Sequence, residues 1–123
     1  MKVVVDGSDI DEYCHKNYKA YPRLFEPAQD AFMNERGIGF AAIEQLFGLR
    51  SPVKLMEVAY HQELREGDEV EITTEVSVGN TSITYYQAAT KDGVVAAEMK
   101  LVVVLTTSEG PARIPDEIRA KLK

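Results

Sequence analysis

Residues 69–78 alternate along their whole length between apolar or β-branched side chains and more polar ones. One set is Val70, Ile72, Thr74, Val76 and Val78, and the other is Glu69, Glu71, Thr73, Glu75 and Ser77. Successive residues of a strand point to opposite faces of a sheet, so this run predicts a strand with one buried and one wet side. Such a strand is typical of an antiparallel sheet that is covered on one face only.

Further β-rich runs surround this strand. Residues 82–91 and 94–106 are separated by Asp92-Gly93, a dipeptide that favours a tight hairpin turn. A less regular run at 53–63 predicts a fourth strand, and residues 2–6 predict a short strand near the start of the chain. We therefore expect a curved antiparallel sheet of about five strands.

Residues 22–36 show the spacing of a helix with one buried side. The apolar stripe consists of Leu24, Phe25, Ala28, Ala31 and Phe32, and the residues off it include Arg23, Glu26, Asp30 and Glu35. Gly37 is suited to end this helix. Pro27 lies inside it and is expected either to kink the helix or to reset its start.

Two shorter helices are also predicted. Residues 40–47 form one that Gly48 ends, and residues 114–119 form another with Pro115 at its first position. The order is strand, long helix, short helix and then about four antiparallel strands, which indicates an α+β fold. No repeat or linker interrupts the chain, so we expect a single domain over residues 1–123.

Composition excludes several classes of protein. The chain has 14 Lys and Arg against 20 Asp and Glu, and this net charge of −6 argues against a general nucleic-acid binder. Its one cysteine, Cys14, excludes an intramolecular disulfide scaffold. The longest apolar run, residues 101–105, is far too short to cross a bilayer. We expect a soluble, cytoplasmic protein.

The polar segment at residues 9–18 holds two aspartates, a glutamate, one of the two histidines and the cysteine. It lies between the first predicted strand and the long helix, and loops that rigid elements position often carry active sites. The start of the helix beyond it offers unpaired N–H groups and a positive dipole end, which suit a developing oxyanion.

This segment resembles the signature D-x-D-x-x-G-H-V-N-N-x-x-Y-x-x-x-F-E-x-A-R of the hotdog-fold acyl-CoA thioesterases of the 4-hydroxybenzoyl-CoA thioesterase type. Eight positions match without gaps, namely Asp9, Asp11, His15, Asn17, Tyr21, Phe25, Glu26 and Ala28. The departures from the signature include Cys14, Tyr18 and Gln29, where the family has Gly, Asn and Arg. These departures concern the identity of the substrate more than the type of reaction.

The resemblance implies a hotdog fold, in which the curved sheet wraps around one long central helix, and it implies thioester hydrolysis. Asp11 would be the nucleophile or the general base for water, and the backbone N–H of Tyr18 would polarise the thioester carbonyl. His15 is a further catalytic candidate that orients groups or acts as a base. No metal or cofactor is expected, because the CoA or acyl-carrier thioester is itself the substrate.

Other residues of the segment have candidate roles in binding or in structure. Asn17, Tyr21 and Glu26 are the candidate substrate-binding residues, although Glu26 also fits a solvated or interface carboxylate. Asp9 is expected to hold the loop by accepting backbone hydrogen bonds. Cys14 next to His15 is a less favoured nucleophile, because adjacent side chains in a loop rarely face one another.

Two alternatives use the same fold. A hydratase would need an Asn-Pro and a five-residue spacing from acid to histidine, whereas Asp11 and His15 are four apart and no Asn-Pro occurs. A non-catalytic acyl-CoA-binding or regulatory module is the stronger rival, and the retained Asp11 favours the enzyme.

The resemblance also implies assembly, with the acid from one chain and the pocket walls from the other. A lone curved sheet leaves unpaired edge groups, so we expect a homodimer, which could pair into a homotetramer. An acidic protein that binds the phosphates of CoA needs cations near its pocket. The candidates are Arg50, Lys54, Lys91 and Arg113.

Overall fold

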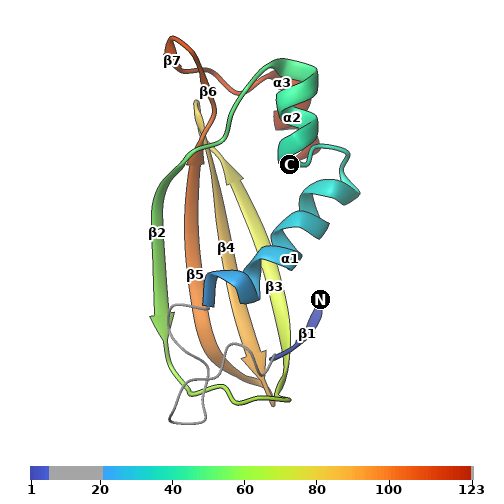
Figure 1. Ribbon diagram of the computed structural model, residues 1–123, viewed down its shortest axis with the longest axis vertical. Helices are drawn as coiled ribbons and strands as arrows, with labels where there is room; N and C mark the ends of the chain where they lie inside the picture. The colour runs from blue at the N-terminus through green and yellow to red at the C-terminus, as the bar shows by residue number, and fades with distance from the viewer. Residues whose placement is uncertain (6–20, 123) are drawn as a thin grey trace.

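The computed structural model describes residues 1–5 and 21–122 of the chain. Its main feature is a five-stranded antiparallel sheet in the order β1-β3-β4-β5-β2 (Figure 1). The strands are β1 (Lys2–Val4), β2 (Val53–Tyr60), β3 (Glu69–Val78), β4 (Ser82–Lys91) and β5 (Val94–Val104). The predicted α+β fold with about five antiparallel strands is therefore confirmed.

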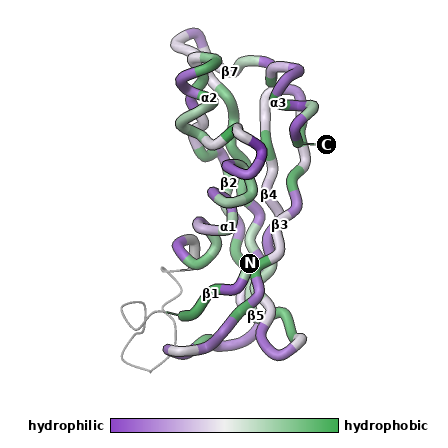
Figure 2. The backbone as a smooth tube through the Cα atoms, turned by 90° about the vertical axis from the view of Figure 1, so that its right-hand side faces the viewer, coloured by the Kyte–Doolittle hydropathy of each residue, from purple (hydrophilic) through white to green (hydrophobic). Residues whose placement is uncertain are grey.

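Three helices accompany the sheet. They are α1 (Tyr21–Glu35), α2 (Phe40–Phe47) and α3 (Asp116–Lys121). Seen from the side, α1 forms a layer of its own beside the sheet (Figure 2). Within the described part of the chain, no helix has the length and apolar character needed to span a membrane.

The central helix α1 packs against β3 and β4 through its apolar stripe. Leu24, Phe25 and Ala28 are buried there, and β3 turns its predicted apolar side toward the same core with Val70 and Ile72 buried. The helix α1 covers mainly the half of the inner face that β3 and β4 form. The other half, formed by β5 and β2, lies beside the helix. This arrangement leaves room for a pocket between α1 and β2.

The helix α1 continues through Pro27, where the sequence predicts a kink or a new start. A proline inside a helix removes one backbone hydrogen bond, here the one to the carbonyl of Arg23. The helix nevertheless extends to Glu35, and its apolar stripe is buried against the sheet, so packing outweighs the lost bond. Gly37 follows the helix in the left-handed conformation (φ 70°), as expected for its end.

A second small sheet was not predicted from the sequence. The sequence predicts one strand over residues 94–106, whereas β5 ends at Val104 in the structure. Two strands of two residues each, β6 (Thr106–Thr107) and β7 (Gly110–Pro111), follow and pair as a small hairpin. Strands this short carry no alternating pattern that could indicate them. Thr106 also pairs with Arg50, so the hairpin is tied to the segment between α2 and β2.

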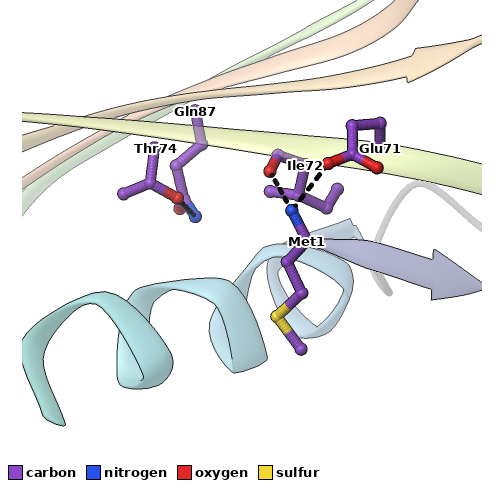
Figure 3. Close-up of polar contacts among 5 residues, drawn as sticks. All are labelled: Met1, Glu71, Ile72, Thr74 and Gln87. Atoms are coloured by element: carbon purple, nitrogen blue, oxygen red, sulfur yellow. Dashed lines mark hydrogen bonds and ion pairs between the residues drawn. The ribbon is translucent and has the colours of Figure 1, made fainter. Parts of the chain in front are cut away.

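A buried polar network joins α1 to the sheet. The side chain of Gln29 donates to Oε1 of Gln87 at 2.7 Å, and Gln87 Nε2 lies 3.1 Å from both the Phe25 carbonyl and Thr74 Oγ1. Both glutamines are buried. Near this network, the amino group of Met1 lies 2.9 Å from both Glu71 Oε1 and the Ile72 carbonyl (Figure 3).

Replacing one member of this network should be costly. Gln87→Leu leaves the Gln29 amide buried without its acceptor, so we expect the free energy of unfolding to fall by about 2–3 kcal/mol. Urea denaturation measures the change. The double variant Gln29→Leu/Gln87→Leu is the control, because replacing both partners should recover part of the loss. An equal or greater loss in the double variant would contradict this account.

Candidate active site

Four residues of the predicted site, Asp11, His15, Asn17 and Tyr18, lie outside the described residues. The described chain reaches both sides of this segment. On one side, the N–H of Val5 donates to the Asp68 carbonyl at 2.9 Å, so the chain enters the segment from a fixed point at the sheet. On the other side α1 begins at Tyr21, and no aspartate or glutamate occupies its first turn. The positive end of the helix dipole is therefore not offset by an acid of that turn.

Two candidates remain, Tyr21 and Glu26. Tyr21 is the first residue of α1. Glu26 is exposed on α1 and lies one helical turn before Asp30. Residues four apart share a helix face, so these two carboxylates lie on the same side of α1. Together with Gln29 they line a pocket of about 240 Å³, which we call the α1–β2 pocket. The structure thus places Glu26 at a cavity as well as at the surface.

The wall of the α1–β2 pocket opposite these polar groups is apolar. It consists of Val53 and Met56 of β2, Met99, Leu101 and Val103 of β5, and Phe40 of α2. Ser51 also lines the pocket. Opposed apolar and carboxylate-bearing walls are typical of small-molecule sites, where a few polar groups fix the orientation of a mostly apolar ligand.

Buried hydroxyl groups occur at and beside this pocket. Among the described residues, neither Ser51 Oγ nor the Tyr85 hydroxyl has a hydrogen-bond partner, although both atoms are buried. The Tyr85 ring meets Phe40 edge-on, with 6.3 Å between the ring centroids. Burial raises the pKa of Tyr85 above its ordinary value, and the Asp30 carboxylate raises it further. The Tyr85 hydroxyl is therefore protonated at physiological pH.

Removing the Tyr85 hydroxyl should not weaken the fold. We expect Tyr85→Phe to raise the free energy of unfolding by about 1 kcal/mol, because a buried hydroxyl without a partner destabilises the folded state. Folding raises the pKa of Tyr85, so its protonation contributes to the free energy of unfolding. That contribution is fully present below the ordinary pKa of 10.0 and is lost as the pH rises above this value. The variant should lack this alkaline decline. Urea unfolding at pH 8 and pH 11 tests both points, and a variant less stable than wild type at pH 8 would contradict them.

The second histidine lies away from this pocket. His61 Nε2 is 3.0 Å from Glu98 Oε2, and both side chains are about half exposed. His61 follows the last residue of β2, and its N–H donates to the Ala96 carbonyl at 2.8 Å. Within the described ranges, no group of three or more His, Cys, Asp and Glu side chains is placed to hold a metal ion.

The strand β2 forms one edge of the sheet, which we call the β2 edge, and it carries more exposed large hydrophobic residues than any other described strand. Val53, Leu55, Met56 and Tyr60 are all exposed on β2, although they are large hydrophobic residues. This strand pairs with β5 on one side, and no described strand pairs with its other side. An exposed apolar strand edge is a template for pairing with another chain.

The sequence offers Glu26 as a candidate site residue but none of the other residues that line this pocket. Asp30 and Gln29 follow Glu26 at helical spacing, and Gln29 also lies one turn after the buried Phe25, so their grouping on α1 could have been found. The walls from β2 and β5 come from segments far along the chain. No local pattern indicates that these segments meet α1.

Comparisons with known proteins give a consistent result. A sequence model described as the thioesterase-like superfamily matches residues 5–122. A gentisyl-coenzyme A thioesterase of known structure has a TM-score of 0.84 and 20% identity, covering 100% of this chain and 98% of its own. A 1,4-dihydroxy-2-naphthoyl-CoA thioesterase from Synechocystis has a TM-score of 0.86 and 10% identity, with coverage of 99% and 93%.

A third structure was solved with a ligand. It is a hypothetical protein from Staphylococcus aureus in complex with CoA, with a TM-score of 0.86, 17% identity, and coverage of 98% of this chain and 78% of its own. At these identities the structural likeness shows a shared fold. No curated protein sequence matches the chain.

Proposed function

Since the chain belongs to the thioesterase-like superfamily and has the hotdog fold, we propose that it hydrolyses acyl-CoA thioesters to a free acid and CoA. The observation that carries this proposal is the family match over residues 5–122, which includes the D-x-D segment. Two proteins of similar structure are thioesterases that act on CoA thioesters, and a third binds CoA.

In this reaction the bond between carbonyl carbon and sulfur breaks, and water supplies the new oxygen on carbon and the proton on the thiol. Asp11 has the central role in two alternative routes. As a general base it takes a proton from the attacking water, and as a nucleophile it forms an anhydride that water then cleaves. Both routes place negative charge on the carbonyl oxygen. The backbone N–H of Tyr18, just before α1, is proposed to stabilise that charge.

We assign the acyl group to the α1–β2 pocket. Its volume of about 240 Å³ exceeds the roughly 150 Å³ of an apolar cavity that accepts benzene, so one ring or a medium aliphatic chain fits. Met56, Leu101 and Val103 would contact the apolar part of the group. Glu26 lies at the polar wall and is proposed to interact with the end of the substrate that carries the thioester.

Two protomers are proposed to pair along their β2 edges. An antiparallel pairing about a two-fold axis would join the two five-stranded sheets and cover the exposed Leu55 and Tyr60. It would also place each α1–β2 pocket next to the other protomer. One chain would then supply Asp11 and its partner would supply pocket walls.

Thiol release measured with Ellman's reagent tests the proposed function against a non-catalytic acyl-binding module. The enzyme should release thiol from short acyl-CoAs over many turnovers, in an amount equal to the free acid formed. A module that only binds would hold acyl-CoA without releasing thiol. Binding without turnover would therefore contradict the proposal and favour the second reading.

A further inference from the structure

A second, polar pocket is lined by residues that follow α2 and by residues in and next to β6. The helix α2 and the β6–β7 hairpin lie at the same end of the molecule (Figure 1). It has a volume of about 500 Å³ and is lined by Gly48, Arg50, Thr106, Thr107 and Ser108. We call it the Arg50 pocket. Its lining contains one positive charge, three hydroxyl groups and no carboxylate.

This composition is unusual for so acidic a chain. Two other pockets include carboxylates, namely Glu57 and Glu98 on the outer face of the sheet and Glu35 beside β3. The α1–β2 pocket includes Glu26 and Asp30. A pocket without such groups, in a protein of net charge −6, favours an anionic ligand.

Of the four candidate cations, Arg50 is the one that lines this pocket and has a charged group without a partner among the described residues. Lys91 is bound to Asp68 at 3.1 Å, and Arg113 is bound to Asp116 at 3.0 Å. The Arg50 guanidinium, in contrast, makes no ion pair or hydrogen bond with any residue that the structure describes. Lys54 lies on β2 and lines neither this pocket nor the α1–β2 pocket.

The backbone holds these groups in place. The N–H of Arg50 donates to the Thr106 carbonyl at 3.0 Å, and the N–H of Thr106 donates back to the Arg50 carbonyl at 2.9 Å. Gly48 adopts a left-handed conformation (φ 67°), and no atom lies within 4 Å of where its Cβ would be, so this side of the pocket is open. A ligand would therefore meet a preorganised site.

The hydroxyl groups are suited to donate to an anion. Thr107 Oγ1 accepts a hydrogen bond from the Glu109 N–H at 3.2 Å, which leaves its own proton free to donate. Thr106 and Ser108 add a hydroxyl on each side of it along the chain. A guanidinium with adjacent hydroxyl donors matches the oxygens of a phosphate group, for which arginine is well shaped.

We propose that the Arg50 pocket binds a phosphate group of the carrier portion of the thioester substrate. This inference rests on the proposed thioesterase function and specifies how its substrate is held. Ser51, the residue after Arg50, lines the α1–β2 pocket, so one short segment borders both pockets.

Arg50→Gln tests the proposal through a comparison of two substrates. The variant should raise the KM for an acyl-CoA at least about tenfold, as expected for the loss of a charge-assisted phosphate contact. The KM for the same acyl group on pantetheine, which has no phosphate, should change by less than about twofold. The ratio of the two KM values is therefore the decisive quantity, and an unchanged ratio would overturn the proposal.

Arg113→Gln is the matched control. It removes the same charge from an exposed arginine that is paired with Asp116 and lies outside the pocket lining. Its KM ratio should equal that of the wild type. An equal rise in both variants would show a general effect of net charge and would also overturn the proposal. The KM of the wild type for acyl-CoA should rise with salt more steeply than that of Arg50→Gln.

Calorimetric binding of free CoA separates this inference from the proposed function. If wild-type protein binds CoA at least about tenfold more tightly than Arg50→Gln does, the phosphate site holds even without hydrolysis. Equal binding of CoA by the two proteins, in an active enzyme, overturns the site and leaves the proposed function intact.

Acyl-pantetheine phosphate distinguishes the source of the phosphate. If Arg50→Gln raises the KM for acyl-pantetheine phosphate, the pocket binds the phosphate that CoA and acyl-carrier protein share. If the variant raises the KM for acyl-CoA alone, the pocket binds the nucleotide phosphates of CoA.

Discussion

Asp11→Asn is expected to lower kcat at least about 100-fold, the scale for loss of a catalytic base or nucleophile. The amide is nearly the same size as the carboxylate, but it can neither take a proton from water nor attack the thioester carbonyl. Substrate binding depends on other groups, so KM should change much less than kcat. Steady-state kinetics with one acyl-CoA, alongside circular dichroism and urea unfolding, measures the effect on chemistry and on folding separately.

Asp9→Asn is the matched control for this variant. It makes the same chemical change two residues earlier in the same segment. If Asp9 holds the loop through backbone hydrogen bonds, its replacement should cost more stability and less kcat than that of Asp11. Near wild-type hydrolysis by Asp11→Asn would show that the catalytic assignment is wrong.

The second large effect is expected at the β2 edge. Leu55→Lys places a charge on the exposed strand that is proposed to pair with its counterpart, and lysine on an edge strand blocks such pairing. Leu55 lies outside the lining of the α1–β2 pocket, so the change does not alter the acyl site directly. We expect the dimer to dissociate and kcat/KM to fall at least about 100-fold, because a site that needs both chains is then incomplete.

Light scattering coupled to gel filtration, run at the assay concentration, measures the first part of this prediction. Val94→Lys is the control, because Val94 is 48% exposed, compared with 39% for Leu55, and lies on β5 beyond its last pair with β2, Tyr60–Ala97. That variant should remain dimeric and active. A monomer of wild-type protein or of Leu55→Lys with full activity would contradict the shared site.

Much of the fold follows from local patterns. The alternation over residues 69–78 coincides with β3, and Gly48 ends α2 in the left-handed conformation that its position indicated. Asp92-Gly93 separates β4 from β5, with both residues at positive φ. In each case a short-range rule sets the structure, so a single sequence is enough to predict it.

Other features depend on contacts between distant segments. Gln29 and Gln87 are 58 residues apart, and nothing local indicates that two buried amides will meet. The Arg50 pocket needs Thr106 beside Arg50, a pairing that short-range spacing does not reveal. For the same reason, the sequence does not distinguish among the four candidate phosphate-binding cations, Arg50, Lys54, Lys91 and Arg113. The structure does, because Lys91 and Arg113 are paired with carboxylates.

Initial rates of thiol release across a panel of acyl-CoAs, aliphatic and aromatic, test the central claim most directly. The panel should be run on dimeric protein with buffer-only rates subtracted. We predict that at least one member is hydrolysed with a kcat/KM of about 10⁴ M⁻¹ s⁻¹ or more, the lower range for enzymes acting on their own substrates. If every member is bound but none is cleaved above the buffer rate, the chain is not an acyl-CoA thioesterase.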